Sequence, residues 1–315
     1  MSKAGDPRLF DLLSSSKNES GEGKMKVGIL GYPCDIGVKR NNGRPGAKRG
    51  PDVVRNRLPK LGPLVNPEFE IDLRAKLCLE DRGNVDVTSN SLEQIHDILT
   101  ERVENILKEK DVLIVVGGGN DQSYCNVRGL MNALKSGEVG VVNIDAHLDV
   151  RPLLDGNRAH SGSPFRQLLT DSEFRKDGAG KFVEFAIQGN QSSAEHAQFV
   201  RDCGGDVIFL SQVKKHSGGA QKKFETVLKS FGAKREVFVS FDIDSIEGAY
   251  CPGVSCPAVI GLTAQDALDI CFTAGQHPNT RLLDLSEFNP DIEEYRTGTL
   301  VCNMIYYFLM GIASR

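Results

Sequence analysis

Two short segments hold the side chains with the clearest capacity for chemistry. Acidic and imidazole side chains recur at every second position directly after the apolar run 139–144, and two carboxylates repeat this spacing after the apolar run 237–241. Side chains at alternate positions of an extended segment point the same way, so each group can converge on one point. If the two strands are neighbours, all of these side chains meet in one place. They are Asp145, His147, Asp149, Asp242 and Asp244.

The four carboxylates of this set require a counter-charge. Without one, some of them would take up protons with strongly raised pKa values. A pair of divalent cations supplies the matching charge, and oxygen ligands with one imidazole suit a hard or borderline ion such as Mn²⁺ better than a metal that prefers thiolates. The spacing therefore predicts a site for two divalent metal ions.

The elements that must position these residues show as alternating patterns along the chain. Short apolar runs typical of buried strands alternate with segments of helical spacing, which indicates βαβ units. Runs that are apolar on both faces predict a parallel sheet covered by helices on each side. No repeat or linker divides the chain, so residues 25–315 are expected to form a single catalytic domain. Strands are expected near 27–30, 112–116, 139–144, 183–187, 207–210, 237–243 and 282–285, and helices near 92–107, 193–202, 220–231, 264–274 and 299–311.

Polar motifs follow the apolar runs with a regularity that scattered surface residues would not have. In an open parallel sheet, ligands bind outside the carboxyl ends of the strands. Each motif begins directly after an apolar run, so the sequence predicts one polar rim along one edge of the sheet. The motifs are the segments 31–44, 117–120, 145–149, 242–244 and 287–290.

Composition narrows the classes of function. The 315 residues are 40% hydrophobic and 25% charged, as in an ordinary globular protein. A formal net charge of −4 gives no electrostatic reason to expect nucleic acid or an anionic membrane as a partner. No apolar run approaches the roughly 20 residues that span a bilayer. Residues 1–24 lack an apolar signal core and are rich in Ser, Gly, Lys and Glu, which predicts a flexible leader and a cytoplasmic location.

Four of the strings together resemble those of the ureohydrolase family, which comprises arginases, agmatinases and formiminoglutamases. They are GGGN at 117–120, DAHLD at 145–149, SFDID at 240–244 and SEFNP at 286–290. The resemblance extends from about residue 26 to the end of the chain. Further strings look most like formiminoglutamase, at 37–51, 149–152, 160–169 and 252–263.

This resemblance implies both a fold and a reaction. The implied fold is a three-layer αβα sandwich with a doubly wound, mostly parallel sheet, as in arginase. The implied activity is that of a manganese-dependent hydrolase with a site for two metal ions. Such an enzyme converts N-formimino-L-glutamate and water to L-glutamate and formamide in histidine degradation. The family also suggests a homo-oligomer.

The resemblance further implies a role for each metal-site residue. Asp145 and Asp242 would bridge the two ions, His147 and Asp244 would complete the second site, and Asp149 would belong to the first. The remaining ligand of the first ion in the family is the histidine of GGGH, where this chain has Asn120. Because an amide oxygen is a weaker and neutral donor, the first ion is expected to bind loosely. The alternative is that Asn120 only caps a loop and the protein has lost its metal.

Three residues are candidates for catalysis beside the metals. In the implied mechanism, a bridging water acidified by two cations supplies hydroxide, which attacks the amidine carbon. Asp149, at the edge of the cluster, is the candidate for carrying a proton to the leaving nitrogen. His160 falls near the position of a family histidine thought to shuttle protons, and a hydrogen-bonded loop residue is the equal alternative. Glu287 would contact the formimino cation, with a structural ion pair as the alternative.

The positive charges that follow the DAHLD motif indicate the class of substrate. Arginases typically have an amide side chain two residues after DAHxD, where this chain has Arg151, and Arg158 follows in the same loop. A guanidinium there would repel a cationic tail and bind a carboxylate, and formiminoglutamate carries two carboxylates. Arg158 and Arg166 could also contact a substrate carboxylate, and the alternative for both is a solvated or structural role. Asn190, in the polar stretch 188–191, is a further candidate for contacting the substrate.

Two hypotheses remain beside this interpretation. The eight cysteines form no CxxC pair, and Cys34 and Cys251 lie in motif loops, where their oxidation would link the two loops. The function also has two alternatives: a ureohydrolase acting on a guanidino substrate such as arginine or guanidinobutyrate, and a catalytically silent relative that binds ligands or partners. Asn120 is the reason to consider the second.

Overall fold

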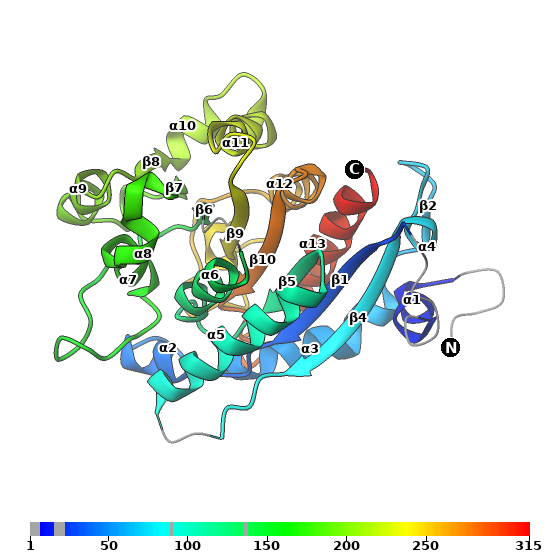
Figure 1. Ribbon diagram of the computed structural model, residues 1–315, viewed down its shortest axis with the longest axis horizontal. Coiled ribbons are helices and arrows are strands. Elements are labelled where there is room, and N and C mark those ends of the chain that lie inside the picture. The colour runs from blue at the N-terminus through cyan, green and yellow to red at the C-terminus, as the bar shows by residue number, and fades with distance from the viewer. Residues whose placement is uncertain (1–6, 16–22, 89–90, 135–137) are drawn as a thin grey trace.

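The centre of the molecule is an eight-stranded sheet in the order β4-β1-β5-β10-β9-β6-β7-β8 (Figure 1). Every neighbouring pair in it is parallel. The computed structural model describes residues 7–15, 23–88, 91–134 and 138–315. The strands are β1 (Met25–Gly31), β4 (Leu77–Asn84), β5 (Val112–Val116), β6 (Val139–Ile144), β7 (Gly180–Ile187), β8 (Asp206–Phe209), β9 (Glu236–Asp242) and β10 (Thr280–Ser286).

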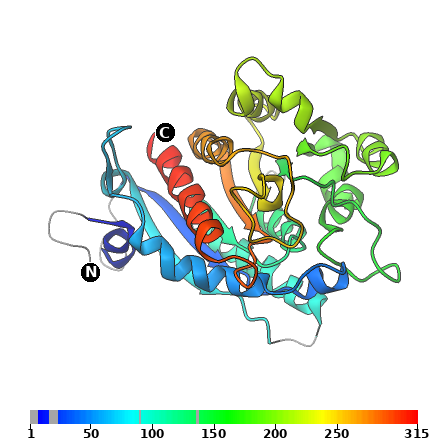
Figure 2. The same ribbon diagram turned by 180° about the vertical axis from the view of Figure 1, so that it is seen from behind.

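Helices cover both faces of this sheet, which makes three layers. Helices α5 and α6 lie in front of the sheet in Figure 1, and α3, α12 and α13 lie in front of it in the reverse view of Figure 2. A short antiparallel pair, β2 (Val65–Asn66) and β3 (Ile71–Asp72), stands apart. The helices are α1 (Leu9–Ser15), α2 (Ile36–Arg40), α3 (Gly50–Arg57), α4 (Leu73–Lys76), α5 (Leu92–Glu109), α6 (Gln122–Ala133), α7 (Pro164–Thr170), α8 (Ser172–Arg175), α9 (Ala194–Asp202), α10 (Leu210–Lys214), α11 (Gly219–Ser230), α12 (Ala264–Gln276) and α13 (Tyr295–Ala313).

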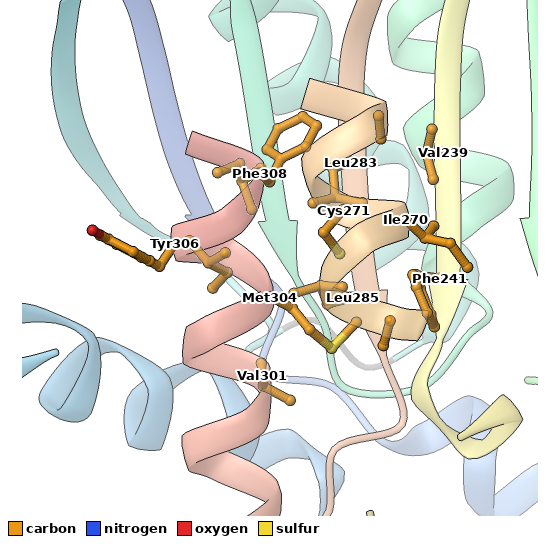
Figure 3. Close-up of a cluster of buried hydrophobic side chains, with 14 of the residues drawn as sticks. Val239, Phe241, Ile270, Cys271, Leu283, Leu285, Val301, Met304, Tyr306 and Phe308 are labelled. Atoms are coloured by element: carbon orange, nitrogen blue, oxygen red, sulfur yellow. The ribbon is translucent and has the colours of Figure 1, made fainter. Parts of the chain in front are cut away.

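The core on the α12 and α13 side fixes the strands that carry the site. Side chains such as Cys271 and Met304 pack against Leu285 of β10 and Phe241 of β9 (Figure 3). Burial of each large apolar side chain contributes about 1.5–3 kcal/mol. The two helices also approach closely, because a Cβ added at Gly311 would lie 2.1 Å from the Phe272 carbonyl oxygen. The carboxyl ends of β9 and β10 are therefore held on a rigid, close-packed layer.

The predicted fold class is confirmed, and each predicted strand is present with boundaries shifted by a few residues. Strand β4 was not predicted, because it is a sheet edge whose buried residues alternate with charged ones such as Glu80 and Arg82. Helix α6 was not predicted either. It is buried on several sides, and its polar residues Ser123 and Asn126 are buried as well, so it lacks the periodic pattern of an amphipathic helix.

One part of the predicted flexible leader forms structure. Residues 9–15 are helix α1, and its Leu9 and Leu12 are buried in the core, since their spacing places both on one helix face. The other leader residues 1–6 and 16–22 lie outside the described part of the chain. Within the described ranges, no helix has the length and apolar character needed to cross a membrane.

Candidate metal centre and active site

The register of the sheet brings the two acidic motifs side by side. Strands β6 and β9 are parallel neighbours, and Ile144 pairs with Phe241. The next residues along the two strands are Asp145 and Asp242, which therefore leave the sheet at the same level. Strand β10 pairs with β9 on the other side, with Ser286 beside Asp242. The predicted polar rim thus exists, and parallel pairing is what creates it.

The five predicted side chains form two overlapping groups. Ligand atoms of Asp145, His147 and Asp244 lie within 4.8 Å of one another, and so do those of Asp145, Asp149 and Asp242. The Nδ1 atom of His147 is 3.3 Å from Asp145 Oδ1 and 3.3 Å from Asp244 Oδ2. Asp145 is common to both groups, while Asp242 belongs to one of them.

Local backbone geometry holds these carboxylates in place. Asp145 Oδ1 accepts a hydrogen bond from the His147 backbone N–H at 2.7 Å, and Asp242 Oδ1 accepts one from the Asp244 backbone N–H at 3.0 Å. Asp149 and Glu287 adopt φ angles of 45° and 68°, in the left-handed region that non-glycine residues rarely occupy. Such a conformation costs on the order of 1–3 kcal/mol and is typical of functional sites.

Burial raises the proton affinity of four carboxyl groups at this site. Burial first, and then the Asp244 charge, raises the pKa of Asp145 to about 6. Burial and the neighbouring carboxylates raise the pKa values of Asp149, Asp242 and Glu287 well above their usual range. The charge of Asp244 likewise raises the pKa of His147. These shifts are those of an acidic cluster without a counter-charge.

The donor set fits divalent metal ions. The described residues supply four carboxylates and one imidazole around two neighbouring positions. Asp244 Oδ1 is buried and has no hydrogen-bond partner among the described residues, which leaves a lone pair free for a cation. A hard or borderline divalent ion such as Mn²⁺ prefers this oxygen-rich set.

Asn120 presents its amino group, not its oxygen, to the cluster. Its Nδ2 donates to Asp149 Oδ2 at 2.8 Å, and a carboxylate can only accept. The amide oxygen faces the other way, toward the Ser123 and Ser286 hydroxyls at 2.8 and 3.0 Å. The Asn120 backbone N–H donates to Glu287 Oε1 at 3.0 Å. The residue therefore orients Asp149 and Glu287 here as a hydrogen-bond donor.

A cavity of about 550 Å³ lies beside the cluster, and Asp149, Asp242, Asp244 and Glu287 line it. Arg151 lines it as well, and its Nη1 donates to Asn41 Oδ1 at 3.0 Å. Other polar residues line the cavity, and most of them lie in or beside a recognised motif. Gln191 belongs to the polar stretch 188–191 that the sequence indicated, whereas the others were not singled out. These others include Asn41, Arg44, His196, Ser255 and Cys256.

Several of the predicted residues do not line the cavity. His160 is 3% exposed, and both ring nitrogens are engaged, with the Pro152 carbonyl at 3.0 Å and the Gly162 N–H at 3.2 Å. The hydrogen-bonded loop alternative therefore describes it, and burial lowers its pKa. Arg158 pairs with Asp155 on the surface at 2.9 Å. Asn190 is exposed outside the lining residues, because the turn after β7 directs Gln191 inward instead.

Arg166 has the structural role that was its alternative. Its Nε donates to the Val150 carbonyl at 2.5 Å, and its guanidinium lies 3.9 Å from the centre of the Phe199 ring. It thus ties the segment after Asp149 to α9. Nothing places it in the cavity lining.

Cys34 and Cys251 are both buried free thiols. Burial, followed by the Asp121 charge, raises the pKa of Cys34 to about 11, and burial and Asp244 raise the pKa of Cys251. The loops that carry them are adjacent, since the Arg44 Nη2 donates to the Val254 carbonyl at 2.7 Å. Their pairing stays a prediction.

Comparisons with known proteins agree with this geometry. Formimidoylglutamase from Staphylococcus haemolyticus is 28% identical over 313 residues, which cover 97% of this chain and 94% of that protein. Formimidoylglutamase from Salmonella paratyphi B is 30% identical over 290 residues, which cover 91% and 86%. The crystal structure of Trypanosoma cruzi formiminoglutamase with Mn²⁺ has a TM-score of 0.88 and 44% identity, and the match covers 98% of this chain and 99% of that one. A sequence model of the arginase family matches residues 25–311, and the chain therefore belongs to the arginase family.

Proposed function

We propose that the protein is a manganese-dependent hydrolase that converts N-formimino-L-glutamate and water to L-glutamate and formamide. The observation that carries this proposal is one cavity that is lined by both the acidic cluster and Arg151. The acidic cluster suits metal ions and an amidinium, and the guanidinium suits a carboxylate. The likeness to formimidoylglutamases over nearly the whole chain supports the same activity.

Two Mn²⁺ ions would be held by Asp145, His147, Asp149, Asp242 and Asp244. When bound, a pair of divalent cations lowers the pKa of water enough to supply a nucleophile near neutral pH. Because the Asn120 amino group faces Asp149, the first ion would have one protein ligand fewer than in relatives with a histidine there. We expect its occupancy to vary with pH and metal supply.

The chain's own side chains would orient the substrate and move its proton. Glu287 Oε1 is held by the Asn120 N–H, so its other oxygen is available to a formimino N–H group. Asp149, fixed at 2.8 Å by Asn120 Nδ2, is the group that would deliver a proton to the leaving nitrogen. Arg151, held by Asn41, would bind a substrate carboxylate. Neither His160 nor Arg158 is assigned a role in this mechanism.

We also propose several finer features of the protein. We expect that residues 25–315 act as one catalytic domain, that the protein is located in the cytoplasm, and that it forms a homo-oligomer. We also retain the hypothesis that Cys34 and Cys251 pair on oxidation. Peptide mapping after mild peroxide treatment tests the last point, and two free thiols would end it.

A turnover assay tests the main proposal. The protein is assayed with formiminoglutamate, arginine and agmatine in the presence of Mn²⁺, and the metal content of the same sample is measured by elemental analysis. We expect turnover of formiminoglutamate alone. Turnover of arginine or agmatine would support a ureohydrolase that acts on a guanidino substrate. A protein that turns over none of the three substrates, whether or not it binds metal, would support the catalytically silent relative.

A further inference from the structure

We propose that Gln191 and Gln188 form a hydrogen-bond chain of fixed direction that sets the tautomer of His147 and leaves its Nδ1 free to bind metal. The inference concerns side chains behind the ligands, and it rests on the proposed metal centre. Both glutamines follow β7, in the turn that leads into α9. Gln191 and Gln188 are positioning residues, because they act through His147.

Three contacts make up the chain. His147 Nε2 lies 3.2 Å from Gln191 Oε1. Gln191 Nε2 donates to Gln188 Oε1 at 3.4 Å. Gln188 Nε2 donates to the Ile260 backbone carbonyl at 2.8 Å. The chain thus runs from the metal-site imidazole to a fixed point on the backbone.

The backbone carbonyl decides the direction. A carbonyl oxygen can only accept, so the amino group of Gln188 must face Ile260 and its Oε1 must face Gln191. Gln191 then has to present its amino group to Gln188 and its oxygen to His147. An oxygen that can only accept requires the proton on His147 Nε2. The other ring nitrogen, Nδ1, lies 3.3 Å from Asp145 Oδ1 and 3.3 Å from Asp244 Oδ2, where its lone pair would face a bound cation.

Backbone hydrogen bonds tie Gln188 and the segment after Ile260 to the loops that carry the ligands. The Gln188 backbone N–H donates to the Ala146 carbonyl at 2.9 Å, between Asp145 and His147. Two residues after Ile260, the Leu262 N–H donates at 2.9 Å to the carbonyl of Ser245, the residue directly after Asp244. Gln188 is 2% exposed, so water does not compete for its amide. The two loops that supply ligands around His147 are therefore joined through this pair of amides.

Metal-bound histidines generally donate their second ring N–H to a fixed acceptor, and loss of that acceptor weakens metal affinity about 10–100-fold. The test is a titration of the metal-free protein with Mn²⁺ alone, with free Mn²⁺ measured by electron paramagnetic resonance. Gln191→Leu should weaken one of the binding events by about 10–100-fold. Gln191→Glu keeps an acceptor oxygen and should retain at least wild-type affinity.

Two further variants complete the design. Gln198→Leu removes an exposed glutamine of α9 whose amide donates to Asp202 at 2.7 Å, and this variant should bind Mn²⁺ as the wild type does. Gln188→Leu removes the link between Gln191 and the Ile260 carbonyl and should weaken the same binding event as Gln191→Leu, by a smaller factor. It also serves if Gln191→Leu does not fold.

The proposal fails if Gln191→Leu and Gln188→Leu, both folded, bind Mn²⁺ with wild-type affinity. It also fails if Gln191→Glu weakens binding as much as Gln191→Leu, since the acceptor would then be irrelevant. The readout needs no substrate. A protein that shows the expected affinity pattern and does not hydrolyse formiminoglutamate would overturn the proposed function and leave this inference intact.

Discussion

At the scale of single residues, the identity of one atom decides what Asn120 does. Its position after the third glycine of GGGN was evident from the sequence, and so was its departure from a histidine ligand. The orientation of its amide was not, because it is set by the carboxylate of Asp149 on one side and the hydroxyls of Ser123 and Ser286 on the other. Those contacts come from three separate segments.

Asn120→His should raise the Mn²⁺ content of the first site, because an imidazole offers a lone pair where the amide offers N–H. The measurement is bound Mn²⁺ per chain at limiting metal, together with the hydrolysis rate. Asn120→Ala is the matched control, since it removes the contact to Asp149 and adds no ligand. Equal metal content in the histidine and alanine variants would contradict the prediction.

Arg151→Gln should weaken binding of the dianionic substrate. A hydrogen bond to a charged group contributes about 1.5–3 kcal/mol, which corresponds to a KM higher by about 10–100-fold. The kcat should change less, because Arg151 would bind a substrate carboxylate, whereas Glu287 and Asp149 would act on the formimino group. Arg158→Gln, on the surface beside Asp155, should leave KM unchanged. A rise in KM for Arg158→Gln with none for Arg151→Gln would reverse the assignment.

At the scale of elements, the strands that carry the site could be predicted from the sequence. The turns and backbone contacts that orient the neighbouring side chains could not. The apolar runs and the period of two placed Asp145 and Asp242 at one rim, because parallel strands share their carboxyl ends. His160 was assigned from a local string alone, and the backbone carbonyl of Pro152 that engages it is not visible in a sequence pattern. Gln191 faces inward because of the turn after β7, which a polar stretch does not specify.

A buried ion pair joins two helices behind the metal loop. His96 of α5 contacts Asp121, the residue before α6, at 2.8 Å, and the Tyr32 hydroxyl donates to the same carboxylate at 2.8 Å. Burial lowers the pKa of His96, but the contacts with Cys125 and Asp121 outweigh it and raise the pKa to about 10. The pair positions the start of α6, directly after Asn120.

His96→Gln should therefore destabilise the protein, in a way that depends on pH. Removal of one partner of a buried ion pair costs about 3–5 kcal/mol. The folded pKa lies above the unfolded value of about 6.5, so the stabilisation is fully present below that pH and is lost as pH rises through about 10. Denaturant unfolding of both proteins between neutral pH and pH 10 should show the difference shrinking. His216→Gln, between α10 and α11, is the control, and a difference independent of pH would contradict the prediction.

At the scale of the whole molecule, the packing of the layers holds the acidic side chains close together although their charges repel one another. The α12 and α13 core fixes the carboxyl ends of β9 and β10, so the acidic residues cannot move apart to relieve their repulsion. Two divalent cations would relieve it instead. The stability of the entire fold should then depend on metal, because ions that bind only the folded state stabilise it by mass action.

This dependence should reverse the response of the protein to pH. Without metal, the pKa of Asp145 is raised to about 6 in the folded state against about 3.9 when unfolded, so the folded protein holds the extra proton and loses stability as pH rises between these values. With Mn²⁺, protons compete with the metal, and stability should increase as pH rises through the same range. Unfolding midpoints from pH 4.5 to 7, with a chelator and with excess Mn²⁺, measure both slopes. Asp145→Asn should flatten the slope without metal, and parallel slopes in the two conditions would show that the cluster does not hold the ions.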